Sequence, residues 1–424
     1  MATAALDAEV RLMDSSFFMS YPHDVYTRMR REQPVYWSER DGVWALTKYD
    51  DIRYASKRPE LFANEYHVYV TAARHADDGD PHVGTSPSRR AELRRVDGRG
   101  PLDSDNLVMA DGDRHRFLRR IASYAFTPRA IGQLERSVVQ YANECFDEIP
   151  VDVEVDFVDA VAAPVPMAMI AVMLGVPTEL LADFRRWSDA FIEMADETTH
   201  GDPDFQQRVA EVLEFREYFR EQLLNRKGNP RDDLLTALAH AEWEGAPLPI
   251  EDQLSMAQVL LIAGNETTRG LIAGAGLELY RHPDQRQILI DQSELLPAAV
   301  EELLRYVTPV THMCRTAMCD TEIRGTKIRA GDYVCLLYPS GNRDEDIWER
   351  ADDLDVTRPP DPTHVAFGFA EHFCLGAQLA RREARIVLGE LLRRFPNYEI
   401  VGDTTRVRQH MTPGIKKMPA VFHD

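Results

Sequence analysis

Residues 367–376 read FGFAEHFCLG, and the cysteine in this stretch, Cys374, is the most informative residue of the chain. The loop leads directly into a helical pattern that begins at Ala377. At the start of a helix, unpaired backbone N–H groups and the helix dipole favour a thiolate over a thiol. A thiolate held in this way is a strong axial ligand for haem iron. The alternative is a buried structural cysteine, the common fate of a free thiol.

Length and composition limit the classes to which the chain can belong. Its 424 residues contain no Ser/Gly-rich or Pro-rich linker, which predicts a single large domain over residues 1–424. The formal net charge of −21 argues against nucleic acid as a partner, because phosphate binding needs a concentrated basic face. There is no signal-peptide pattern and no apolar run of about 18 residues, so we expect a cytoplasmic protein without a membrane span.

Helical periodicity dominates the chain, with short strand-like runs near both ends. Residues 34–49 predict a hairpin around the Asp41-Gly42 turn, and residues 311–338 predict a second strand-rich region. The predicted fold class is therefore mainly α with small β-sheets. Residues 71–105 are polar and rich in Gly, Asp and Arg, which is typical of either a substrate lid or a disordered insert.

Residues 250–280 predict the longest helix, because they lack proline and are apolar on most faces. The middle of this helix reads AGNETT, residues 263–268, and so places a carboxylate where burial is costly. The Thr267 hydroxyl can bond the carbonyl of Ala263, and Glu266 offers an acid beside this alcohol. Such a pair is able to relay protons to an oxygen atom bound in the notch that the small residues leave. The alternative is a Thr/Glu patch on an exposed helix face.

Two further pairs of residues have helical spacing. Glu302 and Arg305 lie three residues apart and can form an ion pair, although most such pairs are solvated and contribute little. His115 and Arg119 lie four residues apart and share a face that can bind an anion such as a carboxylate. By itself, this second pair is equally compatible with a basic surface helix.

Taken in order along the chain, these residues resemble the cytochrome P-450 family of haem-thiolate monooxygenases, in its soluble bacterial form. The resemblance rests on residues 263–268, the Glu302/Arg305 pair and the loop around Cys374, and it extends over nearly the whole chain. It implies one large fold with a long central helix over the haem.

The resemblance also implies a role for individual residues. Cys374 is the implied proximal ligand of the iron, and Glu266 with Thr267 is implied to deliver protons to bound dioxygen. The residues at positions implied to bind the cofactor, haem b, are His115, Arg119, Ala263, Arg315, Phe367, His372, Cys374 and Gly376.

Three features of the chain depart from the family pattern, and the first is that residues 71–105 are longer than the corresponding loop of most relatives, which normally caps the substrate. Arg358 is implied to join Glu302 and Arg305 in a structural network under the haem, but residues 351–354 lack the usual proline and aromatic residue. Ala370 stands where most relatives have glycine. If the backbone needs a positive φ there, alanine is strained by about 1 kcal/mol.

The implied reaction inserts one atom of dioxygen into a C–H bond of a hydrophobic small molecule, while the other atom leaves as water. We expect electrons from a ferredoxin and its NAD(P)H-dependent reductase, because no flavin or iron–sulfur motif is visible. Arg114, Arg116 and Arg120 are the candidates for a basic docking patch on the proximal side.

The implied substrate pocket is mostly apolar, with walls that include Ile262, Val310, Thr311 and Thr412. The runs at residues 310–315 and 414–422 are similar to members that oxidise sterol side chains and methyl-branched lipids, so we expect a steroid, a sterol or a branched lipid. A terpenoid hydroxylase and a peroxide-driven peroxygenase are the alternatives within this chemistry. A helical binding protein without catalytic activity is the alternative outside it.

His312, Cys314 and Cys319 also suggest a zinc cluster. However, the first two alternate like strand residues, and no fourth ligand has a suitable spacing. Cys145 and Cys335 have the surroundings of core cysteines. The sequence therefore predicts no zinc site.

Overall fold

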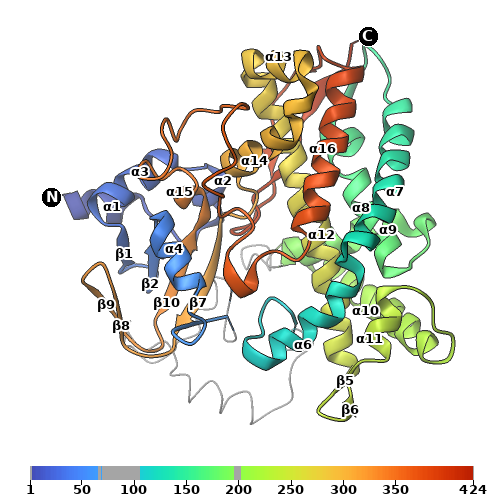
Figure 1. Cartoon of the computed structure of the whole chain (residues 1–424), viewed down its shortest axis with the longest axis horizontal. Helices are drawn as coiled ribbons and strands as arrows, with labels where there is room; N and C mark the ends of the chain where they lie inside the picture. Colours follow the sequence, from blue (N-terminus) through green and yellow to red (C-terminus); the bar gives the residue numbers. More distant parts are fainter. Residues whose placement is uncertain (1, 65–67, 69–105, 195–201, 424) are drawn as a thin grey trace.

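The computed structural model describes residues 2–64, 68, 106–194 and 202–423. In this part of the chain the fold is mainly α-helical with small β-sheets, as the sequence predicts. Helices fill one side of the molecule, and the main sheet with the N-terminal helices fills the other (Figure 1). The polar segment 71–105 lies outside the described residues, so its role as a lid or an insert stays a prediction.

The main sheet combines strands from residues 35–63 with strands from residues 312–337. The order of its strands is β1 (Val35–Ser38), β2 (Val43–Leu46), β10 (Tyr333–Leu337), β7 (His312–Ala317) and β3 (Phe62–Ala63). The pairing of β1 with β2 is antiparallel and confirms the predicted hairpin. The strand β10 runs parallel to β2 and antiparallel to β7, so the predicted C-terminal strands add directly to the N-terminal hairpin.

Four smaller sheets lie outside the main one. They pair β11 (Glu399–Ile400) and β4 (Glu154–Asp156) with β14 (Pro419–Val421), β12 (Thr405–Arg406) with β13 (Ile415–Lys417), β5 (Glu242–Trp243) with β6 (Ala246–Pro247), and β8 (Thr321–Ile323) with β9 (Thr326–Ile328).

A long helix, α12 (Ile250–Arg281), crosses the helical side of the molecule (Figure 1). It confirms the helix predicted over residues 250–280. Because it packs against α8 (Pro164–Leu174), α9 (Leu181–Met194) and α16 (Ala377–Arg394), most of its faces are buried. This surrounding explains why its apolar residues do not form a single stripe.

The other helices surround α12 or cover the sheet. They are α1 (Ala2–Glu9), α2 (Ser15–Met19), α3 (His23–Glu32), α4 (Tyr49–Ser56), α6 (Gly112–Ser123), α7 (Pro128–Asp147), α10 (Phe205–Gly228), α11 (Leu234–Ala239), α13 (Pro283–Asp291), α14 (Leu296–Val307) and α15 (Tyr338–Gly341).

Glycine allows α8 to approach α12 closely in the middle of the long helix. A Cβ atom on Gly264 would lie 2.1 Å from Cδ1 of Ile170. Because real Cβ atoms do not come this close to another atom, a side chain at residue 264 would force the end of Ile170 to move. The contact fixes one wall of the space beside Thr267.

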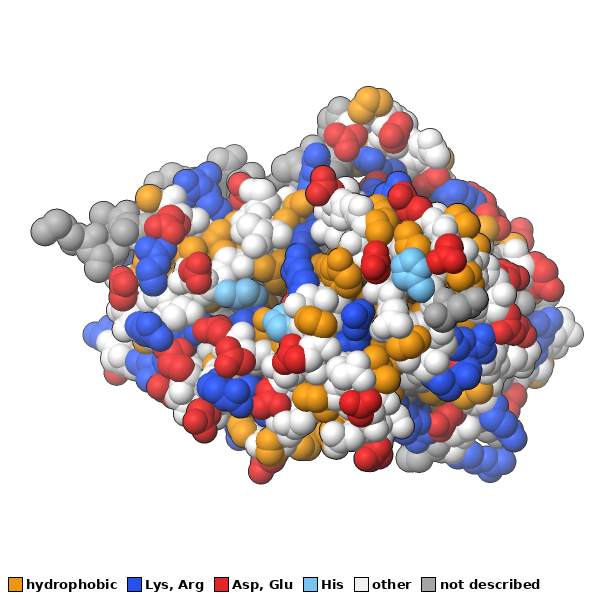
Figure 2. All heavy atoms as spheres, turned by 90° about the horizontal axis from the view of Figure 1, so that it is seen from above, with side chains coloured by type: hydrophobic (Ala, Val, Ile, Leu, Met, Phe, Trp, Pro, Cys, Tyr) orange, Lys and Arg blue, Asp and Glu red, His pale blue; other side chains and the backbone are white. Residues whose placement is uncertain are grey.

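Charged side chains of both signs are interspersed over the face of the molecule seen in Figure 2. Among the described helices, none combines the length and the apolar character that a membrane crossing requires.

Candidate active site

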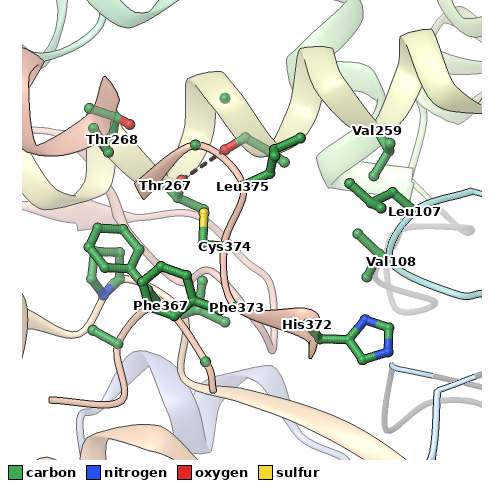
Figure 3. A pocket seen from close by; sticks show the side chains of 18 of the residues that line it. Leu107, Val108, Val259, Thr267, Thr268, Phe367, His372, Phe373, Cys374 and Leu375 are labelled. Carbon is green, nitrogen blue, oxygen red and sulfur yellow. Dashed lines mark hydrogen bonds between the residues drawn. The ribbon is translucent and has the colours of Figure 1, made fainter. Parts of the chain in front are cut away.

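A cavity lies between the middle of α12 and the loop at residues 366–376 (Figure 3). Its volume is about 220 Å³, counted as the space that the centre of a water molecule can occupy. Cys374 and Thr267 project into this cavity from its two sides. Most of the wall is apolar, with contributions that include Val108, Ile170, Val259, Leu271, Val310 and Met313.

Backbone hydrogen bonds and one arginine hold the loop that carries Cys374. The N–H of Cys374 donates to the carbonyl of Phe367 at 2.9 Å. Arg119 on α6 donates to the carbonyls of Glu371 and Phe373 at 3.2 and 2.9 Å. Because these bonds fix the backbone next to Cys374, its thiol is presented to the cavity instead of being packed in the core.

The pKa of the Cys374 thiol is raised, because burial outweighs the groups that stabilise a thiolate. Those groups are the backbone N–H groups of Gly376 and Ala377 and the charges of Arg119 and Arg381. The backbone groups at the helix start favour the thiolate, as the sequence predicts, while burial acts in the opposite direction. Coordination to a metal deprotonates a thiol outright, and the same groups then stabilise the coordinated sulfur.

Ala370 adopts φ 60°, in the left-handed region that favours glycine. The sequence predicts strain at this residue if its backbone needs a positive φ, and the structure has that backbone. The conformation starts a short turn (Ala370–His372) in which the carbonyl of Ala370 accepts the N–H of Phe373 at 3.0 Å. An alanine in this region costs roughly 1 kcal/mol.

The helix α12 is loosened on the opposite side of the cavity. The Thr267 hydroxyl donates to the carbonyl of Ala263 at 2.8 Å, as the sequence predicts (Figure 3). Ala263 is exposed to the cavity, so the notch predicted from the small residues is present.

Glu266 is not among the described residues that line the cavity. Its side chain is buried and accepts a hydrogen bond from Arg269, one turn further along α12, at 2.6 Å. Burial raises the pKa of Glu266, and Arg269 opposes this shift. Arg269 also lies 3.4 Å from Asp189 on α9, whose side chain is 41% exposed. A chain of charged groups therefore leads from behind Thr267 to the surface.

The sequence analysis missed Arg269 and a second buried acid, Glu383 on α16. Glu383 lines the cavity and accepts a hydrogen bond from Thr268, and no arginine, lysine or histidine is paired with it in the described structure. Burial raises the pKa of Glu383 to about 8. The available signal was a glutamate among the apolar residues of a predicted helix, close to the cysteine in sequence.

Polar side chains gather at one edge of the cavity, namely those of His115, Arg119, Arg315 and His372. Both ring nitrogens of His115 are buried and have no hydrogen-bond partner among the described residues. Burial lowers the pKa of His115 to about 4, so this residue offers a neutral N–H and is not the cation expected from the sequence. His372 Nε2 lies 3.0 Å from Asp111 Oδ1.

The structure brings Glu302, Arg305 and Arg358 together. Two hydrogen bonds of 2.7 Å join Arg305 to Glu302, and Arg358 Nε lies 3.1 Å from the same carboxylate. The network therefore forms although the preceding segment departs from the family pattern. Arg305 also donates to three backbone carbonyls, those of Asn342, Ala351 and Asp353.

Three of the four residues expected in the substrate pocket lie elsewhere, while Val310 does line the cavity. The hydroxyl of Thr311 donates to the His410 carbonyl at 2.7 Å, and that of Thr412 donates to the side chain of Gln409 at 2.7 Å. Ile262 packs against the hydrophobic core. These two hydroxyl groups are therefore satisfied by partners away from the cavity.

The three arginines expected to form a basic patch are in different surroundings. Arg114 is paired with Asp252 at 2.5 Å, which turns it toward the start of α12. Arg116 is paired with the neighbouring Asp113. Arg120 is exposed at the end of α6. The structure therefore corrects the patch, because within the described residues only its last member extends into solvent without forming an ion pair with an acid.

A cysteine that faces an apolar cavity beneath a loosened helix, with nitrogen donors at the rim, is the arrangement of a haem-thiolate enzyme. The family model described as Cytochrome P450 matches residues 62–415. The chain therefore belongs to the cytochrome P450 family, and it is a monooxygenase, an oxidoreductase that incorporates molecular oxygen.

Similar proteins extend over the whole length of the chain. Linalool 8-monooxygenase of Pseudomonas putida is 34% identical over 95% of this chain and 95% of its own length. Steroid C26-monooxygenase of Mycobacterium tuberculosis is 32% identical over 98% and 97%, and methyl-branched lipid omega-hydroxylase of Mycobacterium bovis is 34% identical over 99% and 92%. A solved cytochrome P450 of the bacillaene polyketide synthase of Bacillus subtilis matches 98% of this chain and 100% of its own, with a TM-score of 0.82 and 29% identity.

Membership of the family implies a cysteine-ligated haem, a small-molecule substrate, dioxygen and a redox partner. The residues present fit such a haem. The cavity offers the Cys374 thiol and apolar walls, while the unpartnered nitrogens of His115 and the guanidinium groups of Arg119 and Arg315 suit buried carboxylates.

Proposed function

We propose that the protein hydroxylates a steroid, a sterol or a methyl-branched lipid. The observation that carries the proposal is the placement of Cys374 and Thr267 on the two sides of an apolar cavity. Relatives named for steroid and branched-lipid oxidation support this substrate class. A terpenoid is the second candidate, because a further relative is named for oxidation of linalool.

Ligand-induced spin-shift titrations distinguish the two substrate classes. The purified holoprotein is titrated in parallel with a sterol, a methyl-branched fatty acid and linalool. We expect the sterol or the branched acid to bind at least about ten-fold more tightly, because a larger apolar surface is removed from water. Tighter binding of linalool would assign the protein to the terpenoid class instead.

The cofactor that we assign is haem b, held by Cys374 and by the polar rim that includes His115 and Arg315. When bound, it supplies the activation of dioxygen. The apolar wall excludes water from the substrate, and the hydroxyl of Thr267 is placed to pass a proton into the cavity. Glu266 is the proton source behind it, connected to solvent through Arg269.

Replacing the thiol tests the assignment of Cys374. Cys374→Ser is expected to lose the red-shifted Soret band of the reduced carbon monoxide complex together with substrate oxidation. The exposed Cys319→Ser is the matched control and should keep both. A Cys374→Ser variant that kept the thiolate spectrum would overturn the assignment, and a wild-type protein without that band would favour a binding protein that lacks this chemistry.

The electron donor that we propose is a ferredoxin reduced by an NAD(P)H-dependent reductase. Its docking site includes Arg120, which is exposed on the helix that also bonds the Cys374 loop through Arg119. Arg120→Glu is expected to slow reduction by ferredoxin several-fold without changing substrate affinity, because charge complementarity mainly affects association. Arg116→Glu, at a site already paired with Asp113, is the control. Equal rates in wild type and Arg120→Glu would exclude this docking site.

Peroxide as the oxidant is the alternative to dioxygen. The Thr267–Ala263 bond and the buried Glu266 behind it support dioxygen, since they provide a route for protons. Comparing product formation with NADH plus redox partners against product formation with hydrogen peroxide decides between them. Turnover that is faster with peroxide alone would establish a peroxygenase.

A further inference from the structure

The two faces of β7 have different chemistry. Met313 and Arg315 line the cavity. Successive side chains of a strand point to opposite faces, so His312 and Cys314 are directed away from the cavity. On that side Cys314 belongs to a hydrophobic cluster with residues of the N-terminal helices, and the ring of Phe18 stacks on His312 with centroids 4.5 Å apart. This face is therefore separate from the active site.

A second cysteine faces Cys314 across the strand pair. Cys335 on β10 is the register partner of Cys314 on β7. The N–H of Cys314 donates to the Val68 carbonyl at 2.9 Å, and so it points away from β10. The pair is consequently of the non-hydrogen-bonded type, in which Cα atoms are about 4.5 Å apart and side chains are closest. Cys335 is buried in a hydrophobic cluster, which confirms the predicted core cysteine, and the strand pairing adds Cys314 as its neighbour.

His312 completes a group of three ligands. One ligand atom from each of His312, Cys314 and Cys335 lies within 4.8 Å of the other two, and all three residues are buried. Thr311 Oγ1 donates to the His410 carbonyl at 2.7 Å and lies 2.9 Å from His312 Nδ1. Because the hydroxyl proton is used by the carbonyl, Nδ1 carries the proton of the ring and Nε2 keeps its lone pair. An oriented ring of this kind is typical of histidine ligands.

We propose that His312, Cys314 and Cys335 form a binding site for a divalent thiophilic cation of the zinc type. Binding forms two metal–sulfur bonds and one metal–nitrogen bond, a water molecule that the cation brings with it fills the fourth position, and the two thiol protons are released to solvent. Two thiolates and one neutral imidazole then balance the charge of a divalent cation. A neutral complex suits this apolar surrounding, whereas a monovalent cation such as Cu(I) would leave a buried negative charge.

The position of the site determines how the cation enters. Cys314 and Cys335 are fully buried beneath a cluster that includes Leu6, Phe18 and Tyr26. The cation therefore binds as the N-terminal segment folds over the sheet, and it is released slowly afterwards. Cys319, which the sequence placed in the candidate cluster, is exposed and lies outside the group of three.

The metal content of the holoprotein tests this proposal. The protein is produced with zinc in the medium, treated with a chelator while folded, and analysed for zinc and iron, so that haem iron serves as the internal standard. We expect about one zinc per iron in the wild type and in Cys319→Ser, and less than about one tenth in Cys314→Ser/Cys335→Ser. Zinc below one tenth in the wild type, or equal in all three proteins, would overturn the site.

A second measurement covers the case in which the double variant does not fold. His312→Gln removes one ligand and keeps both thiols. Wild type and variant are refolded with cadmium, and the thiolate-to-cadmium charge-transfer band is recorded for each. We expect a weaker band in His312→Gln than in the wild type. An unchanged band in this variant would contradict the three-ligand site. Intact-mass detection of a Cys314–Cys335 disulfide in the purified wild type would also contradict it, because an oxidised pair cannot supply two thiolates.

Discussion

The molecule buries two Glu–Arg pairs of identical sequence spacing, one on α14 and one on α12, and they differ in how completely they are bonded. Glu302 and Arg305 share two hydrogen bonds, Arg305 also donates to three carbonyls, and Glu302 accepts the backbone N–H of Asp355. Glu266 and Arg269 have fewer partners: Nε of Arg269 is buried without a hydrogen-bond partner in the described structure, and its further acid lies 3.4 Å away.

This difference separates a structural pair from one that can change its protonation. A fully bonded buried pair holds its neighbours in place, and breaking it leaves an uncompensated charge. A pair with few partners and a carboxyl whose pKa is raised can exchange a proton at lower cost. Spacing along a helix therefore predicts that two residues meet, whereas the groups around them determine what the pair does.

The largest effect is expected from breaking the fully bonded Glu302–Arg305 pair. Arg305→Leu leaves Glu302 buried with Arg358 as its remaining cation and removes the donor of three backbone carbonyls. It should lower the free energy of unfolding by about 3–5 kcal/mol, measured by urea unfolding of the holoprotein. Arg393→Leu is the matched control, because Arg393 and Glu390 have the same spacing on α16 but are partly exposed. The control should lose less than about 0.5 kcal/mol. Similar losses in both variants would contradict the distinction drawn between buried and solvated pairs.

The next largest effect concerns Glu383, a buried acid without a cationic partner. Its folded-state pKa of about 8 is above the unfolded value of 4.5, so the folded protein binds the extra proton. The associated stability is present below about pH 4.5 and is lost as the pH rises through about 8. The stability of Glu383→Gln relative to wild type should therefore increase by roughly 4 kcal/mol between about pH 5 and about pH 9. A variant with the wild-type pH profile of unfolding would show that Glu383 is ionised in the folded state.

Replacing Glu266, the acid of the Glu266–Arg269 pair, is expected to affect turnover more than stability. Glu266→Gln should reduce product formation about 100-fold or more, since a positioned proton donor contributes on this scale. Glu251→Gln, at an acid that is 44% exposed on the same helix, is the control and should keep its activity. The measurement is product formed per NADH consumed at saturating substrate. Unchanged product yield in Glu266→Gln would remove it from the proton route.

The smallest effect is expected in the loop that carries Cys374. Ala370→Gly relieves the positive φ and should raise the free energy of unfolding by about 0.5 kcal/mol, because lower strain is partly offset by greater freedom of the unfolded chain. Gly368→Ala introduces the opposite change at φ 69° and should cost about 1 kcal/mol. Thermal unfolding of the two variants in parallel gives the comparison. Destabilisation by Ala370→Gly would show that the alanine side chain stabilises the loop.

Local sequence features predicted the elements of this fold and one side of its site well. The hairpin, the long helix, the Thr267–Ala263 bond and the contact of Glu302 with Arg305 each depend on residues close together in the sequence, so spacing was sufficient to find them. The possible positive φ of Ala370 came instead from the resemblance, because most relatives have glycine at this position, and the structure has that backbone.

Features that depend on contacts between distant segments were missed or assigned wrongly. The hydroxyl of Thr311 is bonded to residue 410, nearly one hundred positions away, so its sequence position beside the cavity-lining Val310 was misleading. The pKa of Cys374 is set by burial, which opposes the local effect of the helix start. Cys335 meets Cys314 only because two strands pair.

The bonds from Arg119 to the Cys374 loop have a consequence for evolution and protein engineering. The helix α6 supplies His115 to the cavity rim, and through Arg119 it also holds the backbone next to the sulfur. We expect a substitution that shifts this helix to admit a new substrate also to move the backbone beside Cys374, the iron ligand that we propose. Selectivity and reduction potential are then expected to change together, so a library that varies α6 is best screened for both.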